Sequence, residues 1–295
     1  MSLEATAGRG IDHLVLPVKD LGKARERYAA LGFTLTPDAQ HPFGSGNFLA
    51  QLQGSFLEVL SITRPELVPE AAPGHFSFAG YNRDFLTRRE GFSMLVFESA
   101  DARRDQAEFL SEGLQTYAPF DFERQAKLPS GESVTVGFSL AFVTEPGVPD
   151  AVFFTCQQHA PQYFWKPSYQ KHPNSAQSVE EVVMVAPEPR ALEGLFVGLQ
   201  GRERVAAHAD SLTIKTARGR ISVQTPAGYE ARFPGGTPQE APLTPYFAAY
   251  AVGVSDIARC EAVLTESGLA FEREGRSLLL APQDAFGTAI AFREI

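Results

Sequence analysis

The sequence is poor in cysteine, and its only two, Cys156 and Cys260, lie far apart in the chain. Two cysteines at that separation provide neither a disulfide framework nor the paired spacing of a zinc knuckle. Disulfides are rare in the cytoplasm, where thiols are kept reduced. We therefore expect both residues to be free thiols in a cytoplasmic protein.

Basic residues are also scarce, with 26 Lys and Arg against 35 Asp and Glu, a net charge of -9. Such an excess of acid disfavours binding to nucleic acid or to an anionic membrane surface. No segment approaches the roughly 18 consecutive apolar residues of a transmembrane helix. Residues 1–10 lack the apolar centre of a secretion signal. We expect neither a nucleic-acid partner nor a membrane partner.

What the sequence does contain is a fourfold repeat, in a chain long enough for two domains. Each repeat has an apolar, strand-like run, a residue that starts a helix, a glycine 12 positions later, and three more strand-like stretches. Aspartate caps a helix start, proline suits a first turn, and glycine ends a helix. The pattern predicts four strand-helix-three-strand modules. The starting residues and their glycines are Asp20 and Gly32, Asp101 and Gly113, Pro189 and Gly201, and Asp256 and Gly268.

Two connections are too long to be turns, and such joins are uncommon unless they cover a site. Residues 64–90 form the first, which is rich in aromatic residues and predicts a lid or clasp. Residues 160–176 form the second, which holds the only tryptophan, Trp165. A flexible linker would be rich in Gly and Ser, so we expect this join to pack against the protein. The domain boundary is placed inside it, near Pro173.

Two titratable residues interrupt apolar runs, His13 in the first run and Glu58 in the run at 56–60. By the alternation of side chains along a strand, His13 should share a face with Ile11 and Val15. A buried carboxylate rarely lacks a partner, so we expect a metal or other cation at Glu58, with an arginine as the alternative. A strand histidine is also often a hydrogen-bonded core residue, and both interpretations of His13 stay open.

The stretch 11–21, IDHLVLPVKDL, resembles the opening strand of the glyoxalase / bleomycin-resistance / extradiol-dioxygenase superfamily, also called vicinal oxygen chelate proteins. The match to the glyoxalase-like branch extends through Ile62, and the repeat extends the architectural resemblance over nearly the whole chain. The resemblance implies an α+β fold in which the four modules pair into two half-open barrel domains, residues 1–165 and 175–295.

In that family two modules form a cup around one divalent metal, with ligands from the first and last strands of each module. Carried over residue by residue, the first module matches with His13 and Glu58. The second has Met94 in place of the histidine, and a thioether is a poor ligand for a hard divalent ion. Its last strand ends at His159, which we predict as a third ligand or a base, with a surface role as the alternative.

The C-terminal pair of modules matches the family's ligand pattern poorly. Glu181 sits opposite the position of His13, but the last module has Ala249 and Ala291 at the ligand positions. We therefore expect any metal, whether Zn, Mn, Fe(II) or Ni, to lie in the N-terminal half.

The function that the resemblance implies is a metal-dependent lyase or isomerase acting on a small organic substrate, with Glu58 and His159 as catalytic groups. The alternatives are a metal-free binding protein of the resistance type and a ring-cleaving dioxygenase. A homodimer is an open alternative to a monomer. Aromatic residues of the joins could equally pack between modules, and Arg83 could pair with Asp84. The predicted pocket residues are His75, Phe78, Tyr81, Arg83 and Trp165.

Overall fold

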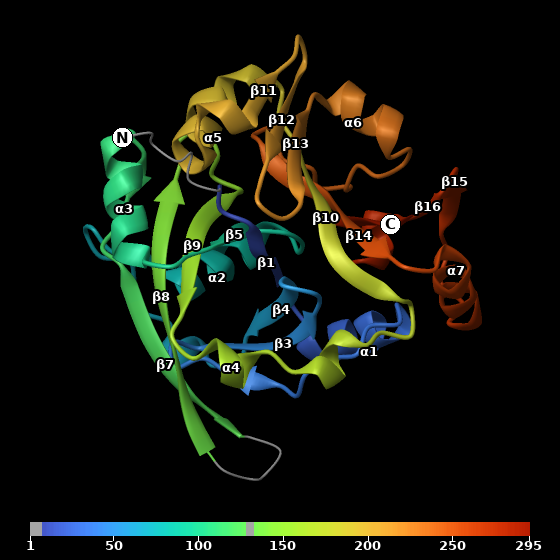
Figure 1. The fold of residues 1–295 in the computed structure, drawn as a ribbon, viewed down its shortest axis with the longest axis horizontal. Helices are drawn as coiled ribbons and strands as arrows, with labels where there is room; N and C mark the ends of the chain where they lie inside the picture. The colour runs from blue at the N-terminus through green and yellow to red at the C-terminus, as the bar shows by residue number, and fades with distance from the viewer. Residues whose placement is uncertain (1–7, 128–132) are drawn as a thin grey trace, which may run out of the picture.

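The computed structural model describes residues 8–127 and 133–295, which form two curved sheets with helices between and around them (Figure 1). The first sheet has the order β2-β3-β4-β1-β5-β9-β8-β6, with β7 paired to β8. Its strands are β1 (Ile11–Pro17), β2 (Ala39–Gln40), β3 (Ser45–Gln51), β4 (Phe56–Ile62), β5 (Met94–Glu98), β6 (Gln115–Thr116), β7 (Phe120–Lys127), β8 (Ser133–Thr144) and β9 (Val152–Gln158).

The second sheet repeats this order as β11-β12-β13-β10-β14-β17-β16-β15. In each sheet the first strands of two modules pair antiparallel, β1 with β5 and β10 with β14. The predicted α+β fold of four modules in two half-open barrels is therefore confirmed. The strands are β10 (Ala176–Val185), β11 (Val205–Ala207), β12 (Ser211–Lys215), β13 (Arg220–Gln224), β14 (Tyr246–Val254), β15 (Glu272–Glu274), β16 (Ser277–Leu280) and β17 (Ala289–Glu294).

The helices begin where the repeat places them. The carboxylate of Asp20 accepts a hydrogen bond from the Lys23 amide at the start of α1, and Asp101 and Asp256 cap α3 and α7 in the same way. In the third module Pro189 begins a short 3-10 helix that leads into α5. The helices are α1 (Leu21–Ala30), α2 (Phe78–Arg88), α3 (Ala102–Ser111), α4 (Pro161–Phe164), α5 (Glu193–Gln200), α6 (Pro226–Arg232) and α7 (Ile257–Glu266).

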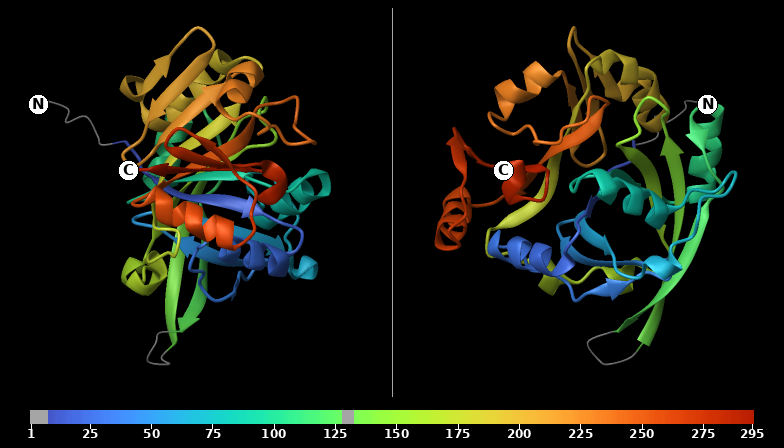
Figure 2. Two further views of the ribbon diagram at one scale, coloured as in Figure 1. Left: turned by 90° about the vertical axis from the view of Figure 1, so that its right-hand side faces the viewer. Right: turned by 180° about the vertical axis from the view of Figure 1, so that it is seen from behind.

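The two halves share one apolar core, formed by the faces of the two sheets that carry the helices. The rings of Phe92 and Phe247 stack across it with centroids 4.2 Å apart. Gly32 ends α1 with a φ of 84°, and a Cβ at this position would stand 2.7 Å from the side chain of Val263 on α7. Glycine is thus required both by the left-handed conformation and by the close approach of α1 and α7 (Figure 2).

Each sheet also encloses a separate apolar cluster in its concave face. His13 and Val15 face the first of these clusters, but Ile11 belongs to the core between the halves. The prediction that Ile11 shares a face with His13 is therefore wrong. The register of β1 against β5 shifts between the two residues, and the extra residue of such a bulge, Asp12, reverses the alternation of side chains.

The two long joins close the first cup. The join after β4 forms α2, which starts at the cap residue Ser77 and buries Phe78 and Phe85. The join after β9 forms α4, and the side-chain amide of Gln51 accepts from the Lys166 amide and donates to the Phe164 carbonyl. This second join packs against the N-terminal half. No helix in the described ranges is both long and apolar enough to span a membrane.

Candidate functional site

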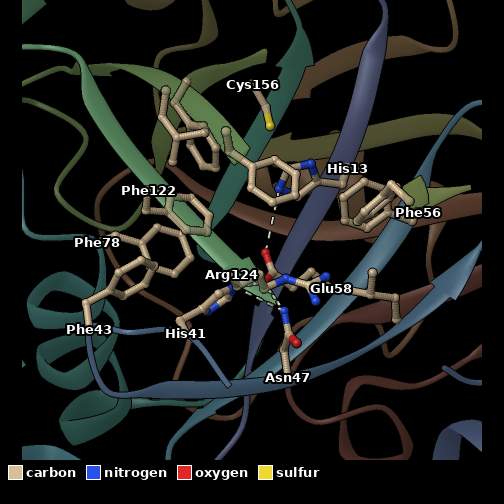
Figure 3. A pocket seen from close by; sticks show the side chains of 15 residues that line it. His13, His41, Phe43, Asn47, Phe56, Glu58, Phe78, Phe122, Arg124 and Cys156 are labelled. Atoms are coloured by element: carbon tan, nitrogen blue, oxygen red, sulfur yellow. Dashed lines mark hydrogen bonds and ion pairs between the residues drawn. The ribbon is translucent and has the colours of Figure 1, made fainter. Parts of the chain in front are cut away.

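The cup of the first sheet holds a pocket with phenylalanine walls (Figure 3). The cavity volume is about 50 Å³. The empty space is about 490 Å³ when the open mouth is included. The apolar lining is Phe43, Phe56, Phe78, Phe122, Phe138, Phe154, Phe164, Leu49 and Leu140, and the other lining residues are His13, His41, Asn47, Glu58, Arg124 and Cys156.

His13 is held on β1 by its neighbour Asp12. Its Nδ1 atom lies 2.6 Å from Oδ2 of Asp12, whose Oδ1 accepts a longer hydrogen bond from Gln158. The imidazole stacks on Phe56 with centroids 4.2 Å apart. When Nδ1 donates to Asp12, the lone pair of a neutral ring is at Nε2. This atom is 3.6 Å from Oε2 of Glu58.

His41 approaches the same carboxylate from the turn before β3. Its Nδ1 atom lies 2.8 Å from the Ser45 hydroxyl, and its Nε2 atom lies 3.7 Å from Oε1 of Glu58. Burial lowers the pKa of His41 to about 4, with the charge of Glu58 opposing the shift and the charge of Arg124 adding to it. At neutral pH the ring is therefore uncharged.

Glu58 lies between the two rings on β4 and is only 5% exposed. The amide nitrogen of Asn47, on the neighbouring strand β3, donates to its Oε1 at 2.5 Å. The distances of 3.6 and 3.7 Å to the imidazoles are too long for hydrogen bonds. Among residues 8–127 and 133–295, the side chain of Asn47 is the hydrogen-bond donor to Glu58, and it reaches Oε1 and not Oε2. The carbonyl oxygen of Asn47 is also buried and has no partner within the described ranges.

Cys156 and Arg124 complete the polar part of the lining. Burial raises the pKa of the Cys156 thiol well above its ordinary value, and the nearby carboxylates of Asp12 and Glu58 add to the effect. This thiol is protonated at neutral pH, so it is not a nucleophile. Burial lowers the pKa of Arg124, while the charge of Glu58 opposes the change.

The pocket presents the kind of donor atoms that bind divalent metals, but not a closed shell. Two imidazoles with outer hydrogen-bond partners and one carboxylate are typical ligands of Fe(II), Mn or Zn. Among residues 8–127 and 133–295, no three His, Cys, Asp or Glu side chains are grouped so that they could hold a metal ion. The structure shows two imidazole–carboxylate pairs that share Glu58. The second module contributes Phe154 and Cys156 to the lining.

The structure places His159 outside this arrangement. The residue is exposed, and its Nε2 atom lies 2.8 Å from the hydroxyl of Ser139, which in turn donates to Asp121. His13 and Glu58 therefore come together as predicted, whereas His159 does not join them. Its ordered partners fit the surface role that the sequence left open.

Of the predicted pocket residues, Phe78 lines the cavity. Trp165 stands behind the wall, where its ring contacts Phe56 and Phe164. Three others lie away from the lining: His75 is exposed, the Tyr81 hydroxyl donates to the Pro149 carbonyl, and Arg83 pairs with Glu70 and Asp84.

Sequence reasoning missed His41, Asn47 and Arg124. His41 and Asn47 flank the start of β3, which pairs with the strand of Glu58, so the hairpin carries three polar residues to one point. The spacing of His41, Ser45 and Asn47 before an apolar run is the only signal that the sequence contains. The position of Arg124 in the pocket can be predicted only after β7 is recognised as a strand in which aromatic and charged residues alternate.

The C-terminal cup has a buried carboxylate in the corresponding first strand, β10. Glu181 is fully buried and accepts hydrogen bonds from Arg232 at 2.8 and 2.9 Å, from Ser222 at 2.5 Å, and from Arg220 and Arg293. Burial alone would raise the pKa of Glu181, but these partners hold it at about 2. The protein's own guanidinium groups therefore neutralise this carboxylate.

Comparisons with known proteins agree with the fold. The family model described as a glyoxalase-like domain matches residues 11–199. A hypothetical protein from Staphylococcus aureus superposes with a TM-score of 0.67 at 12% identity, covering 97% of this chain and 99% of that one. No curated protein matches the sequence.

Two further structures share the fold at similarly low identity. A variant of 4-hydroxymandelate synthase from Streptomyces coelicolor superposes with a TM-score of 0.59 at 11% identity, covering 98% of this chain and 93% of that one. A Mn(II)-bound glyoxalase from Novosphingobium aromaticivorans superposes with a TM-score of 0.55 at 10% identity, covering 98% and 82%.

Proposed function

Because the chain belongs to the glyoxalase-like domain family, we propose that it is a metal-dependent lyase or isomerase acting on a small organic molecule in the first cup. One observation carries the proposal. Inside a pocket walled by phenylalanine, the two imidazole Nε2 atoms of His13 and His41 face the two oxygens of one carboxylate, Glu58. Such a polar group in an apolar cavity is expected of a reaction centre.

Two imidazoles and one carboxylate suit a divalent cation in kind, although within the described ranges the three side chains are not grouped closely enough to form a preformed site and would have to move together around the ion. Asp12 and Ser45 occupy the Nδ1 atoms of the two rings, and both Nε2 atoms face Glu58, that of His41 lying also 3.4 Å from the amide nitrogen of Asn47. Two ligands of an ion with bonds of about 2.0–2.2 Å can stand up to about 4.4 Å apart, which spans the observed 3.6 and 3.7 Å. His13, His41 and Glu58 would hold the metal. When bound, it would act as a Lewis acid on a substrate oxygen.

The side chains around the metal position define how a proton would move. Asn47 occupies Oε1 of Glu58, so Oε2 would be the metal ligand beside His13 and, once released from the metal, the oxygen that accepts a proton from the substrate. The pKa of His41 is lowered to about 4, so at neutral pH its ring stays uncharged and would serve as a ligand and not as an acid or base. The phenylalanine walls keep water from the reacting atoms, which strengthens the electrostatic interactions inside the pocket.

A second candidate function is a metal-free protein that binds an apolar molecule in the same cup. Two observations favour it. The second module contributes Phe154 and Cys156 where further ligands would be expected, and Arg124 already places a positive charge near Glu58.

Metal binding decides between the two functions. Purified protein freed of metal is titrated with Mn(II), followed by the electron paramagnetic resonance of free Mn(II), and thermal melts are repeated with Zn(II), Fe(II) and Ni(II). We expect saturable binding of one ion and a rise in melting temperature, because a ligand of the native state stabilises it by mass action. His13→Ala, His41→Ala and Glu58→Gln should each abolish both effects.

The matched control is His75→Ala, which removes an exposed imidazole outside the pocket and should bind Mn(II) like the wild type. A wild type that binds none of the four metals would rule out the metal-dependent reaction and leave the binding protein. Binding that survives in all three pocket variants would place the metal elsewhere in the chain.

A further inference from the structure

Arg124 is an exception to the pattern of its own strand. Along β7 the residues Asp121, Glu123 and Gln125 are exposed, whereas Phe122 and Arg124 alternate with them and line the pocket. An alternating strand with one apolar face usually points its charges to water. Here a guanidinium points with the phenylalanines into the cup.

This guanidinium has no partner that accounts for its position. Within the described ranges Arg124 makes no hydrogen bond and no ion pair, and its charge acts on Glu58 and on the ring of His41. The carboxylate is already engaged through Oε1 by Asn47 and faces the imidazoles of His13 and His41. Figure 3 shows Arg124 beside Glu58 and His41. The N–H donors of this guanidinium are thus not taken up by acceptors within the described ranges, and the side chain lines the pocket.

We propose that the ligand of this pocket is a small aromatic or aliphatic carboxylic acid whose carboxylate is bound by Arg124, an inference that rests on the proposed role of the cup as the substrate site. The planar guanidinium fork matches a carboxylate with two parallel hydrogen bonds. Edge-to-face and stacked phenylalanine side chains, such as Phe122 on Phe138 at 5.0 Å, line the space for an apolar body.

The charge balance favours a singly charged acid over a phosphate. Arg124 contributes one positive charge, and Glu58 contributes a negative charge to the same pocket. The charges of Arg124 and Glu58 already offset one another, so a monoanion adds one negative charge to the pocket and a dianion adds two, and the monoanion meets less repulsion from Glu58. The acid group would therefore lie on the Arg124 side of the pocket, away from Glu58.

The only tryptophan provides a direct measurement. Trp165 contacts Phe56 and Phe164, which both line the pocket, so its fluorescence should respond to a ligand there. The probes are two matched pairs, phenylacetate with phenylacetamide and 3-phenylpropanoate with 3-phenylpropanamide. Titrations are made with EDTA present, so that no acid can bind through a metal. The variants are Arg124→Gln, Arg124→Lys and the control Arg83→Gln, which changes an exposed arginine paired with Glu70 and Asp84.

For the wild type and Arg83→Gln we expect each acid to bind at least about tenfold more tightly than its amide, since charged hydrogen bonds are worth that much. Arg124→Gln should bring acid and amide within about twofold, chiefly by weakening the acid, and Arg124→Lys should restore part of the preference. Equal binding of acid and amide by the wild type would overturn the inference, as would a preference that survives in Arg124→Gln.

The test separates this inference from the proposed function. Amides that bind as well as acids would leave the cup as an apolar binding site and remove only the role of Arg124. If none of the four probes changes the fluorescence or the melting temperature, both the carboxylate site and the cup as a small-molecule site are contradicted. Near-ultraviolet circular dichroism of each variant shows that the fold is kept.

Discussion

The Nδ1 atom of His13 lies 2.6 Å from Oδ2 of Asp12, although the two residues are neighbours on one strand. Neighbours in a regular strand point to opposite faces, and only the bulge in β1 lets these side chains meet. Both are about 5% exposed. The bulge therefore fixes which nitrogen of His13 faces the pocket, as outer carboxylates do for ligating histidines.

Replacing this carboxylate should release the ring of His13. In Asp12→Ala we expect the neutral imidazole to populate both tautomers, because nothing then selects Nδ1–H, and Mn(II) affinity should fall about 10–100-fold. Nitrogen-15 NMR of the imidazole reports the tautomer without any metal. Asp38→Ala, which removes an exposed carboxylate paired with Arg25, is the control. An unchanged His13 spectrum in Asp12→Ala would contradict the positioning role.

The buried ring of His41 should make the protein less stable in mild acid. Its pKa is about 4 in the fold against 6.5 for a free histidine. Between these two values His41 binds a proton in the unfolded chain but not in the folded chain. The free energy of unfolding therefore decreases as pH falls from 6.5 toward 4. The loss approaches about 3 kcal/mol, at about 1.4 kcal/mol for each pKa unit. Urea unfolding at several pH values measures it.

His41→Gln should flatten this part of the stability profile, whatever it costs at pH 7. His75→Gln, at an exposed histidine, should keep the slope of the wild type. If His41→Gln and the wild type lose equal stability between pH 6.5 and 4, His41 is not buried in its neutral form.

The ionisation of Glu181 should determine how the free energy of unfolding changes with pH in a more acidic range than that of His41. Its pKa is about 2 in the fold against 4.5 for a free glutamate, so its contribution is present above pH 4.5 and is lost as pH falls toward 2. Arg232→Met should raise this pKa and move the loss to higher pH. The substitution should also lower the free energy of unfolding by about 1–3 kcal/mol at pH 7. This is less than for a fully unpaired buried charge, because Arg220 and Arg293 remain beside Glu181.

The control for this cluster is Arg190→Met, an exposed arginine 3.7 Å from Glu193. Surface pairs of this kind contribute about 0–1 kcal/mol, so its acid unfolding should follow the wild type. Guanidinium chloride unfolding at pH 7, 4 and 3 measures all three proteins. An Arg232→Met protein as stable as Arg190→Met at every pH would show that Glu181 does not depend on Arg232.

The side chain of Gln51 should control the join that carries Trp165. Gln51 is buried and makes hydrogen bonds of 2.9 and 3.1 Å to the backbone on either side of Trp165. Gln51→Leu leaves these backbone groups without partners, which should lower the free energy of unfolding by about 1–3 kcal/mol. The ring of Trp165 should also become more accessible to acrylamide, so that its fluorescence is quenched more strongly. Gln53→Leu, at an exposed glutamine, should change neither. Equal quenching in both variants would contradict this role.

The fold could be predicted from the sequence because its signals are local. Asp20, Asp101 and Asp256 cap helices, and Gly32 ends one, each for reasons that lie within a single turn. The repeat of these signals gives the module count, and the modules can bury their faces only by pairing.

Only part of the site could be predicted, because its geometry depends on the register between neighbouring strands. His13 and Glu58 stand out as charges in apolar runs, but His41 reaches Glu58 only through the hairpin of β3 and β4. A rule of strict alternation also cannot detect the bulge at Asp12. The prediction that Ile11 and His13 share a face was wrong for this reason. Contacts between strands, rather than along them, set these positions.

The core shared by the two sheets makes them one folding unit, although each has a complete strand order of its own. Phe92 in the first half stacks on Phe247 in the second, and the hydroxyls of Tyr28 and Tyr250 lie 3.3 Å apart in the same buried layer. A half made alone would expose this layer, and an apolar surface of that kind promotes aggregation. We therefore expect the second half to act as a folding partner of the half that carries the pocket, because it covers the layer that this half would otherwise expose to water.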